Sequence, residues 1–327
     1  MHILFINRAS IPVFAYGGTE RVIWDLGQAL VKMGHRVSYL VPQGSECHFG
    51  QIIPIQEDLD WQNQIPEDVD IVHFQFNPGL GLELDRPWLI TQHGNSQVSE
   101  PLPENTVFVS QNHALRHNSN CFIHNGLDWS SYGPIELDKT DDYFHFLGKA
   151  AWSVKNVQGA IDSSLQANAP LIVMGGDRLN IKRGFRFTWS RKINFLGMVG
   201  GETKFSVLRK SRGLIFPVRW HEPFGLAAIE SLYFGCPVFA TPYGALPELV
   251  PTECGTLSIK MSDLVDAMKN QSFNREVCHL HAANNFNAEK MAASYFHIYQ
   301  RVINREKLHT AHPCMEISAS KLPWQKN

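Results

Sequence analysis

The sequence lacks an excess of charge of either sign, any apolar run long enough to span a membrane, and any close pairing of cysteines. Its 29 Lys and Arg nearly balance 31 Asp and Glu, for a net charge of -2, which gives no basic footprint for a nucleic-acid partner. No stretch reaches the roughly 18 apolar residues of a membrane span. The six cysteines show no Cys-x-x-Cys spacing, which argues against a zinc site or a disulfide framework and predicts a reducing, cytoplasmic setting.

The length and composition predict about two globular domains. At the usual 100 to 200 residues per domain, 327 residues that are 44% hydrophobic suffice for two hydrophobic cores. The N-terminal run from Met1 to Asn7 lacks the cationic flank and cleavage site of a secretory signal. We therefore expect neither a leader peptide nor an integral membrane protein.

Short runs rich in Val, Ile and Phe alternate with segments of helical periodicity. The predicted strands are residues 3–6, 37–41, 71–74, 88–91, 107–110, 144–147, 171–174, 193–196, 214–217 and 238–240. Continuous apolar strands alternating with helices are typical of parallel sheets covered on both faces. The sequence therefore predicts an α/β protein with two doubly wound, Rossmann-like halves.

A polar stretch from Asp128 to Asp142, rich in Ser, Gly, Pro and acidic residues, is predicted to link the two halves. We expect an N-terminal domain over residues 1–135, a C-terminal domain over residues 136–304, and a weakly ordered polar tail over residues 305–327. Apolar residues at helical spacing predict helices over residues 20–33 and 288–303.

Residues that follow the strands count most for function, because ligands of open parallel sheets gather beyond the carboxyl ends of the strands. The first such cluster is Gly17-Gly18-Thr19-Glu20, before the first helix. Its amide groups suit an anion at a helix N-terminus, or it forms an ordinary turn capped by Thr19. The spacing of a dinucleotide fingerprint is absent, which weakens the case for a nicotinamide or flavin enzyme.

The second cluster runs from His221 to Glu230, after the strand over residues 214–217, with Pro223 suited to the first helical position. The neighbours of Glu230 at helical spacing are apolar or aromatic, so its carboxylate lies in a predicted buried wall. Such a group needs a dedicated partner, either a buried cation or ligand hydroxyls, and we favour the ligand. Glu222, eight positions earlier, lies at the helix mouth as a second ligand contact or as an acid that complements the helix dipole.

Two further clusters follow predicted strands: one contains two lysines and the other contains a histidine. Lys149 and Lys155 follow the strand over residues 144–147 and suit a diphosphate, or they are solvated lysines; Asn156 is predicted to cap the next helix. His93 follows the strand over residues 88–91, where it is either structural or able to hydrogen-bond a ligand or move a proton.

Candidate metal ligands do not converge in the sequence. The patterns Asp58-Leu59-Asp60 and Asp68-Val69-Asp70 match the Asp-x-Asp of metal-dependent sugar transferases, but Asp70 precedes its strand. We interpret both as loop acids. The Gly-x-Ser-x-Gly elbow of hydrolases and the P-loop lysine are absent.

With these residues assembled, the chain resembles the retaining glycosyltransferases of family four, which have the GT-B fold. The resemblance spans Met1 to about Ile303. Its most specific motif is a pair of glutamates at either end of Glu222-Pro223-Phe224-Gly225 through Glu230. The other matches are Gly17-Gly18-Thr19-Glu20-Arg21, Gly34-His35-Arg36-Val37, His124-Asn125-Gly126-Leu127-Asp128, Asn194-Phe195-Leu196-Gly197, Gly235-Cys236-Pro237-Val238 and Gly244-Ala245-Leu246-Pro247-Glu248.

The resemblance implies two Rossmann-like domains facing across a cleft that holds a nucleotide sugar, mainly on the second domain. It implies that a hexose passes, with retention, from a UDP- or GDP-sugar to a saccharide, lipid-linked or small-molecule acceptor, without a catalytic metal or further cofactor. The implied roles are ribose binding for Glu230, sugar binding for Glu222 and His93, diphosphate binding for Lys149 and Lys155, and backbone contacts to the donor at Gly17, Gly18, Phe224, Gly225 and Leu226.

The chain departs from the family pattern at two positions. Lys149 stands where the family usually has Arg, and Ala245 replaces the second glycine of a later pair. Two alternatives stay open: a sugar-nucleotide-binding partner subunit without turnover, or another GT-B chemistry such as that of an epimerase or a phosphorylase. Peripheral membrane contact is a further open question, for instance through a patch around Trp152.

Overall fold

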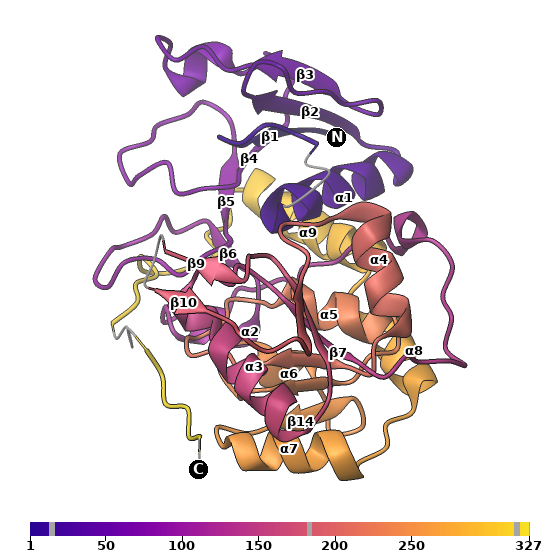
Figure 1. Cartoon of the computed structure of the whole chain (residues 1–327). Helices are drawn as coiled ribbons and strands as arrows, with labels where there is room; N and C mark the ends of the chain where they lie inside the picture. The colour runs from indigo at the N-terminus through magenta and orange to yellow at the C-terminus, as the bar shows by residue number, and fades with distance from the viewer. Residues whose placement is uncertain (13–16, 182–184, 317–320, 327) are drawn as a thin grey trace. The chain divides into compact units, whose positions relative to one another are not determined.

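The computed structural model describes residues 1–12, 17–181, 185–316 and 321–326 (Figure 1). The chain divides into two compact units. Unit 1 comprises Met1–Asp128 and Phe286–Ser318, and unit 2 comprises Trp129–Asn285 and Ala319–Asn327. Each unit contains its own parallel sheet, as the alternation of apolar strands and helices predicts.

The sheet of unit 1 has six parallel strands in the order β3-β2-β1-β4-β5-β6. Their bounds are β1 (His2–Ile6), β2 (Arg36–Val41), β3 (Gln51–Pro54), β4 (Ile71–Phe74), β5 (Trp88–Gln92) and β6 (Thr106–Phe108). The central strands β1 and β4 are buried along their whole length. Helices on both faces require this burial, which explains why the two strands are apolar apart from His2 and His73.

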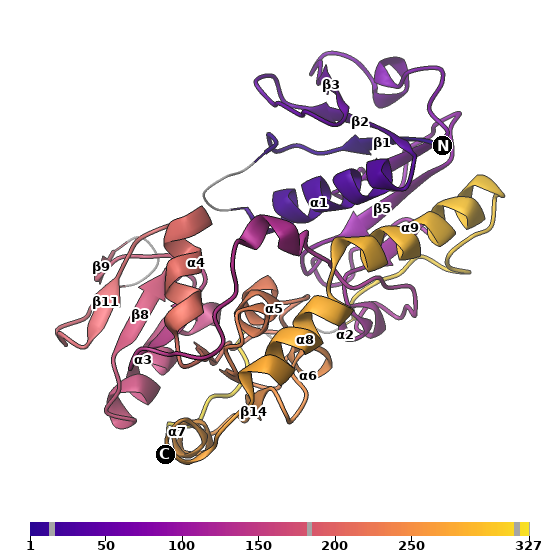
Figure 2. The same ribbon diagram turned by 90° about the vertical axis from the view of Figure 1, so that its right-hand side faces the viewer.

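The helices of unit 1 are η1 (Trp61–Gln64), α1 (Gly18–Lys32), α2 (Gln111–Leu115) and α9 (Ala288–Ile303). Helix α9 lies alongside α1 (Figure 2). On α9, Tyr299 shares a hydrogen bond of 2.9 Å with His73, and Tyr295 one of 2.7 Å with Thr91. These contacts make α9 part of unit 1, whereas the sequence analysis assigned residues 288–303 to the second domain; the expected contiguous division is therefore corrected.

The sheet of unit 2 also has six parallel strands, in the order β11-β8-β7-β12-β13-β14. Their bounds are β7 (Phe144–Leu147), β8 (Leu171–Met174), β11 (Ile193–Phe195), β12 (Leu214–Phe216), β13 (Val238–Ala240) and β14 (Gly255–Leu257). The helices are η2 (Trp129–Tyr132), η3 (Ser153–Lys155), α3 (Val157–Gln166), α4 (Gly201–Lys210), α5 (Leu226–Tyr233), α6 (Leu246–Leu249), α7 (Met261–Asn270) and α8 (Arg275–Asn285). A separate antiparallel pair, β9 (Leu179–Asn180) and β10 (Arg186–Phe187), is inserted between β8 and β11.

All ten strands predicted from the sequence are present, with ends that differ by at most two residues. The helix over residues 288–303 begins and ends as predicted, and the first helix is shifted by one or two residues. The strands β3, β9, β10 and β14 were not predicted. β9 and β10 have two residues each, too short for a hydrophobic period. β3 (Gln51–Pro54) and β14 (Gly255–Leu257) are not continuously apolar.

The C-terminal tail is packed against both units in its described residues, so the expectation of a weakly ordered tail is wrong for residues 305–316 and 321–326. In unit 1, the amide of Leu102 donates to the carbonyl of Pro313 at 2.8 Å. In unit 2, the amide of Gln325 donates to the carbonyl of Ile259 at 2.9 Å. Backbone pairing holds a segment that has little apolar sequence of its own. Across the described residues, no helix combines the length and apolarity needed to cross a bilayer.

Candidate active site on unit 2

The loops at the carboxyl edge of the unit 2 sheet are fastened to one another. Gly148, which follows β7, donates its amide to Met174 at 3.0 Å, and Ala150 donates to the carbonyl of Gly175 at 2.9 Å. Gly175 has a φ of 118° and would collide with the carbonyl oxygen of Gly148 if it carried a Cβ. Only glycine fits such a position. The loop that carries Lys149 is therefore fixed by the loop after the neighbouring strand β8.

Glu222 is held by two donors in a nearly buried position. Its carboxylate accepts hydrogen bonds from Lys155 Nζ at 2.7 and 2.9 Å, and from Trp220 Nε1 at 2.7 Å. The Glu222 residue is 7% exposed. The backbone of Gly244, at φ 67°, packs so closely on Glu222 that a Cβ there would collide with it. The sequence analysis singled out Glu222 and Lys155 separately, and the structure joins them in one ion pair.

Lys155 lies among aromatic rings and retains bonding capacity. Its Nζ is 4.8 Å from the ring centroid of Trp220 and 5.3 Å from that of Phe216. A lysine ammonium has three N–H donors. Two of them point at the two oxygens of Glu222, which leaves the third for a ligand atom.

Lys149 lies on the preceding loop, half-buried, with Nζ 5.1 Å from the ring centroid of Trp152. Asn156 caps α3 as predicted: it adopts the left-handed conformation, and its side chain accepts a hydrogen bond from the amide of Gly159 at 3.2 Å. The half-buried Trp152 ring lies 6.2 Å from that of Trp220. Lys149 thus precedes the short helix η3, and Lys155 is its last residue, directly before the cap of α3.

Helix α5 begins later than predicted. Its N-cap is Gly225 at φ 117°, and its first residue is Leu226. Pro223 therefore lies before the helix and not at its first position. The left-handed turn at Gly225 lets the chain enter the helix abruptly, so the first amide groups of α5, which lack acceptors within the helix, follow directly after the loop of Glu222.

Glu230 lies in the middle of α5 and is 3% exposed, as its apolar surroundings predict. Its Oε1 accepts hydrogen bonds from Tyr132 at 2.7 Å and from Lys204 Nζ at 2.5 Å. Lys204 is itself 4% exposed. Of the two partners foreseen, the buried cation is the one present. This corrects the expectation that a visiting ribose compensates the burial of Glu230; the ribose-binding role itself stays a prediction.

Tyr132, Lys204 and Trp220 are the site residues that sequence reasoning missed. Lys204 carried a signal, since it shares the buried face of α4 with Val207 and Leu208 at helical spacing. A lysine on the apolar face of a helix calls for a buried acid. Tyr132 lay in the segment taken as a linker, and Trp220 carried no pattern that separates it from a core aromatic.

The candidates in unit 1 lie at the carboxyl edge of its own sheet and before α1. His93 Nε2 lies 2.8 Å from the amide oxygen of Gln75, and burial lowers the pKa of His93 from 6.5 to about 4. The ring is thus neutral at pH 7, with Nε2 donating and Nδ1 left as an acceptor. Gly17 is the N-cap of α1 and Gly18 its first residue, so Thr19 lies within the helix and does not cap it.

The Asp-x-Asp patterns lie apart from these groups. Asp58 and Asp60 are exposed. Asp70 precedes β4, as predicted, and accepts a hydrogen bond from the amide of His2 at 2.7 Å. Asp68 pairs with the guanidinium of Arg36. Asp68 and Asp70 thus precede a strand, and Asp58 and Asp60 lie in an exposed segment, as expected for loop acids.

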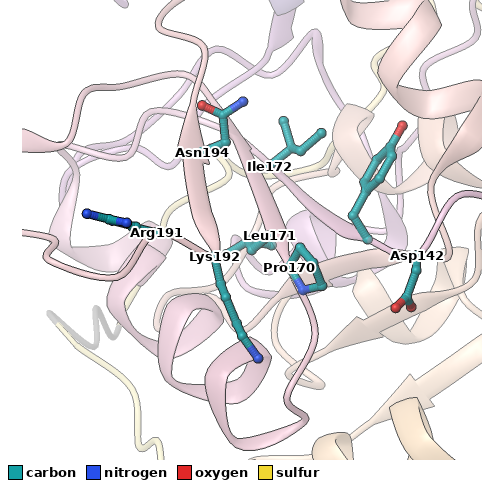
Figure 3. Close-up of a pocket in the computed structure, with 8 residues that line it drawn as sticks. Asp142, Pro170, Leu171, Ile172, Arg191, Lys192 and Asn194 are labelled. Carbon is teal, nitrogen blue, oxygen red and sulfur yellow. The ribbon is translucent and has the colours of Figure 1, made fainter.

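One surface hollow of about 480 Å³ lies at the opposite, amino edge of the unit 2 sheet. Its lining includes Asp142, Pro170, Lys192 and Asn194, which precede or begin β7, β8 and β11. Figure 3 shows Lys192 and Asp142 on opposite sides of Pro170. None of the predicted site residues lines this hollow.

Most of unit 2 matches a known protein family. Residues 142–274, which carry the two lysines and both glutamates, match the family described as Glycosyl transferases group 1. The O-antigen chain mannosyltransferase C of Escherichia coli is 22% identical over 93% of this chain and 99% of its own length.

Solved structures share the fold. AviGT4, a glycosyltransferase involved in avilamycin A biosynthesis, superposes with a TM-score of 0.73 at 18% identity, covering 93% of this chain and 98% of that one. HepE of Anabaena, solved with UDP and glucose, gives a TM-score of 0.65 at 13% identity over 91% and 99%. Residues 142–274 thus match the group 1 family, and the chain shares the two-domain GT-B fold with these solved structures.

Proposed function

We propose that the protein is a retaining glycosyltransferase that moves a hexose from a UDP- or GDP-sugar to a saccharide, lipid-linked or small-molecule acceptor, without a catalytic metal. The observation that carries the proposal is the anchored Glu222. A carboxylate that Lys155 and Trp220 hold beside the N-terminus of α5 combines a fixed acceptor of hydroxyl hydrogens with donors for an anion.

Glu222 retains the capacity to bind a sugar hydroxyl. An ionised carboxylate has about four acceptor positions, and Lys155 and Trp220 occupy three of them. Rigid anchoring lowers the entropy lost when the sugar binds. Glu222 therefore orients the transferred hexose. The sugar-binding role of His93, with Nδ1 as acceptor, stays a separate proposal for unit 1.

The diphosphate is the proposed ligand of Lys149, the third N–H of Lys155 and the first amides of α5. Breaking the glycosidic bond leaves negative charge on the nucleotide, and fixed cations and helix N-termini stabilise that charge. The anomeric carbon gains positive character. Attack from the same face, with a phosphate oxygen taking the proton of the acceptor hydroxyl, gives retention.

The comparisons support the donor class. HepE was solved with UDP and glucose, and the name of the Escherichia coli relative specifies mannosyl transfer, so a nucleoside-diphosphate hexose is the consistent choice. Glu230 is the proposed ribose contact. In that role its carboxylate serves Lys204, Tyr132 and the donor together.

A donor panel tests the proposal. The protein is incubated with UDP- and GDP-hexoses and a set of saccharide and lipid-linked acceptors, and the product anomer is read by NMR. We expect turnover with one donor and retention of the anomeric configuration, both lost in Glu222→Ala. The matched control is Glu253→Ala, an exposed acid of the same unit. Unchanged turnover in Glu222→Ala contradicts the proposal.

A second candidate, a sugar-nucleotide-binding subunit without turnover, is favoured by the internal pairing of both glutamates with lysines. Calorimetry separates the two. Donor binding without turnover across the whole panel supports the subunit, whereas turnover excludes it. Donor conversion without acceptor, or dependence on inorganic phosphate, would instead indicate an epimerase or a phosphorylase.

A further inference from the structure

The antiparallel pair β9 and β10 places a set of apolar side chains on one face. Arg186 pairs with Asn180 and Phe187 with Leu179, and paired residues of an antiparallel ladder point to the same face while neighbours in sequence alternate. One face therefore carries Leu179, Ile181, Phe185, Phe187 and Trp189. We call residues 178–181 and 185–192 the aromatic hairpin.

The apolar face of the aromatic hairpin is turned to solvent. Trp189 is 85% exposed, Phe185 80% and Ile181 72%. Among the described residues these are the most exposed large hydrophobic side chains. Phe187 and Trp189 pack edge to face at 4.6 Å. A cluster of this kind is costly in water and marks an interaction surface.

The opposite face, which is polar in sequence, is turned inward. Arg178 donates to the backbone carbonyls of Thr188, Ser190 and Ile193. The guanidinium of Arg186 lies 4.9 Å from the ring centroid of Phe195, and Thr188 is buried. Most amphipathic elements bury their apolar face. This hairpin does the opposite: its arginines face the rest of unit 2 and its aromatic side chains face solvent. The bonds of Arg178 to Thr188 and Ser190 lie within the hairpin, whereas its bond to Ile193 and the contact of Arg186 with Phe195 attach the inward face to β11.

The sequence around the apolar face is strongly basic. From Asp177 to Lys192 the sequence has six Lys or Arg and one Asp; Arg178 and Arg186 belong to the inward face, and two of the others lie outside the described residues. Arg191 and Lys192 are exposed at the end of the hairpin. Exposed Trp and Phe flanked by basic residues match the chemistry of an anionic lipid surface, with an apolar interior beneath a layer of negative charge.

We propose that the aromatic hairpin docks the protein on an anionic membrane surface. Three side chains of this exposure offer an area on the order of 500 Å², below the roughly 800 Å² per partner of a stable protein interface. A bilayer needs no such area, because inserted aromatics and nearby lysines bind it additively.

The docking surface is connected to the candidate active site. The hairpin follows directly from Gly175 and Gly176, and the carbonyl of Gly175 holds the amide of Ala150 in the Lys149 loop. The hairpin and the loop of Lys149 are thus joined through one hydrogen-bonded turn. The inference goes beyond the proposed function, since membrane binding is measurable without turnover.

Vesicle flotation tests the proposal with the full chain. Vesicles of phosphatidylcholine alone are compared with vesicles containing about one third phosphatidylglycerol. We expect binding to the anionic vesicles, weakened by salt, and a loss of about 100-fold in the partition coefficient for Phe185→Ala/Trp189→Ala. The matched control, Val277→Ala/Leu280→Ala, removes two exposed apolar side chains of α8 (40% and 47% exposed) and should bind like wild type.

A second variant tests the charge. Arg191→Gln/Lys192→Gln should lose about tenfold of the preference for anionic vesicles, and thermal melting should show both hairpin variants to be folded. Wild type that stays off anionic vesicles, or a Phe185→Ala/Trp189→Ala variant that binds them normally, overturns the proposal. A wild-type dimer made monomeric by that variant, without vesicle binding, would also overturn it and assign the face to a second copy of the chain.

Discussion

The carboxyl edges of the two sheets use different chemistry. In unit 2, lysines face carboxylates: Lys155 holds Glu222, and Lys204 holds Glu230. In unit 1, the titratable side chain that follows β5 is His93, which burial keeps neutral and whose Nε2 lies 2.8 Å from the amide oxygen of Gln75. The same arrangement of strands thus supports one edge built on charge and another built on neutral hydrogen bonds.

The difference suits the two sheet edges to different kinds of ligand group. A diphosphate needs cations and helix N-termini, and unit 2 supplies both next to fixed carboxylates. A neutral imidazole suits hydroxyl groups, whose recognition needs direction more than charge. The predictions below test this contrast, first where charge is expected to matter most.

The largest effect is expected on stability at Glu230. Glu230→Gln removes the carboxylate charge that faces buried Lys204, and breaking a buried pair costs about 3–5 kcal/mol. Urea unfolding measures the loss. Lys204→Met/Glu230→Gln removes both charges and should recover most of it, while Gln keeps an acceptor for Tyr132. A double variant as unstable as the single one would show that the unpaired charge of Lys204 is not the cause of the lost stability.

The next effect is on turnover, at Lys155. Lys155→Met should lower kcat/KM about 100-fold, because Glu222 loses its anchor and the donor loses a cation. Initial rates at varied donor concentration measure the change. Lys155→Arg keeps the charge and should restore part of the rate. Equal rates for the Met and Arg variants would show that the positive charge at position 155 does not contribute to turnover.

A smaller effect is expected at Lys149, which is half-exposed beside Trp152. Lys149→Met should weaken nucleoside-diphosphate binding about tenfold in calorimetry, with a reduced dependence on salt, since one charge-assisted contact is lost. Lys192→Met, at the amino edge of the same sheet, is the matched control. Unchanged affinity and salt dependence in Lys149→Met would remove Lys149 from the donor site.

The smallest effect is the pH dependence contributed by His93. Its pKa is about 4 in the folded chain against 6.5 when exposed, so the unfolded chain binds a proton that the folded chain does not. Stability from this group is therefore complete above pH 6.5 and is lost as the pH falls toward 4.

In the variant His93→Gln this contribution is absent. The variant should lose less stability than wild type between pH 7 and pH 5 in urea unfolding. His297→Gln, on the exposed side of α9, is the comparison variant. Parallel curves for wild type and His93→Gln would show that His93 is not kept neutral by the fold.

Prediction from sequence succeeded where one physical rule dominated. Buried parallel strands are mostly apolar, so β1, β4, β7 and β12 could be predicted from their residues, although His73 and His145 lie within β4 and β7. The burial of Glu230 followed from its neighbours at helical spacing, and the capping role of Asn156 from its place before a helix.

The partners of these residues were not readable, because they depend on segments far apart in the sequence. Lys204 and Tyr132 lie 26 and 98 positions from Glu230, and Lys155 lies 67 positions from Glu222. The aromatic hairpin was missed for a related reason. Its period-2 pattern spans two strands of two residues each, and the sequence does not state which face turns outward.

The assignment of α9 to unit 1 has a practical consequence for dissecting the molecule. The chain leaves unit 1 after Asp128 and returns at Phe286, so a fragment ending at residue 135 would lack the tyrosines that bond His73 and Thr91 and would uncover an apolar stripe of α1. Unit 2 also has two pieces, but Trp129–Asn285 is one continuous stretch and the second piece is the short tail segment Ala319–Asn327. Unit 2 is thus the simpler starting point for a minimal fragment, because only a short tail segment lies outside residues 129–285, whereas unit 1 needs the whole of α9 from beyond them.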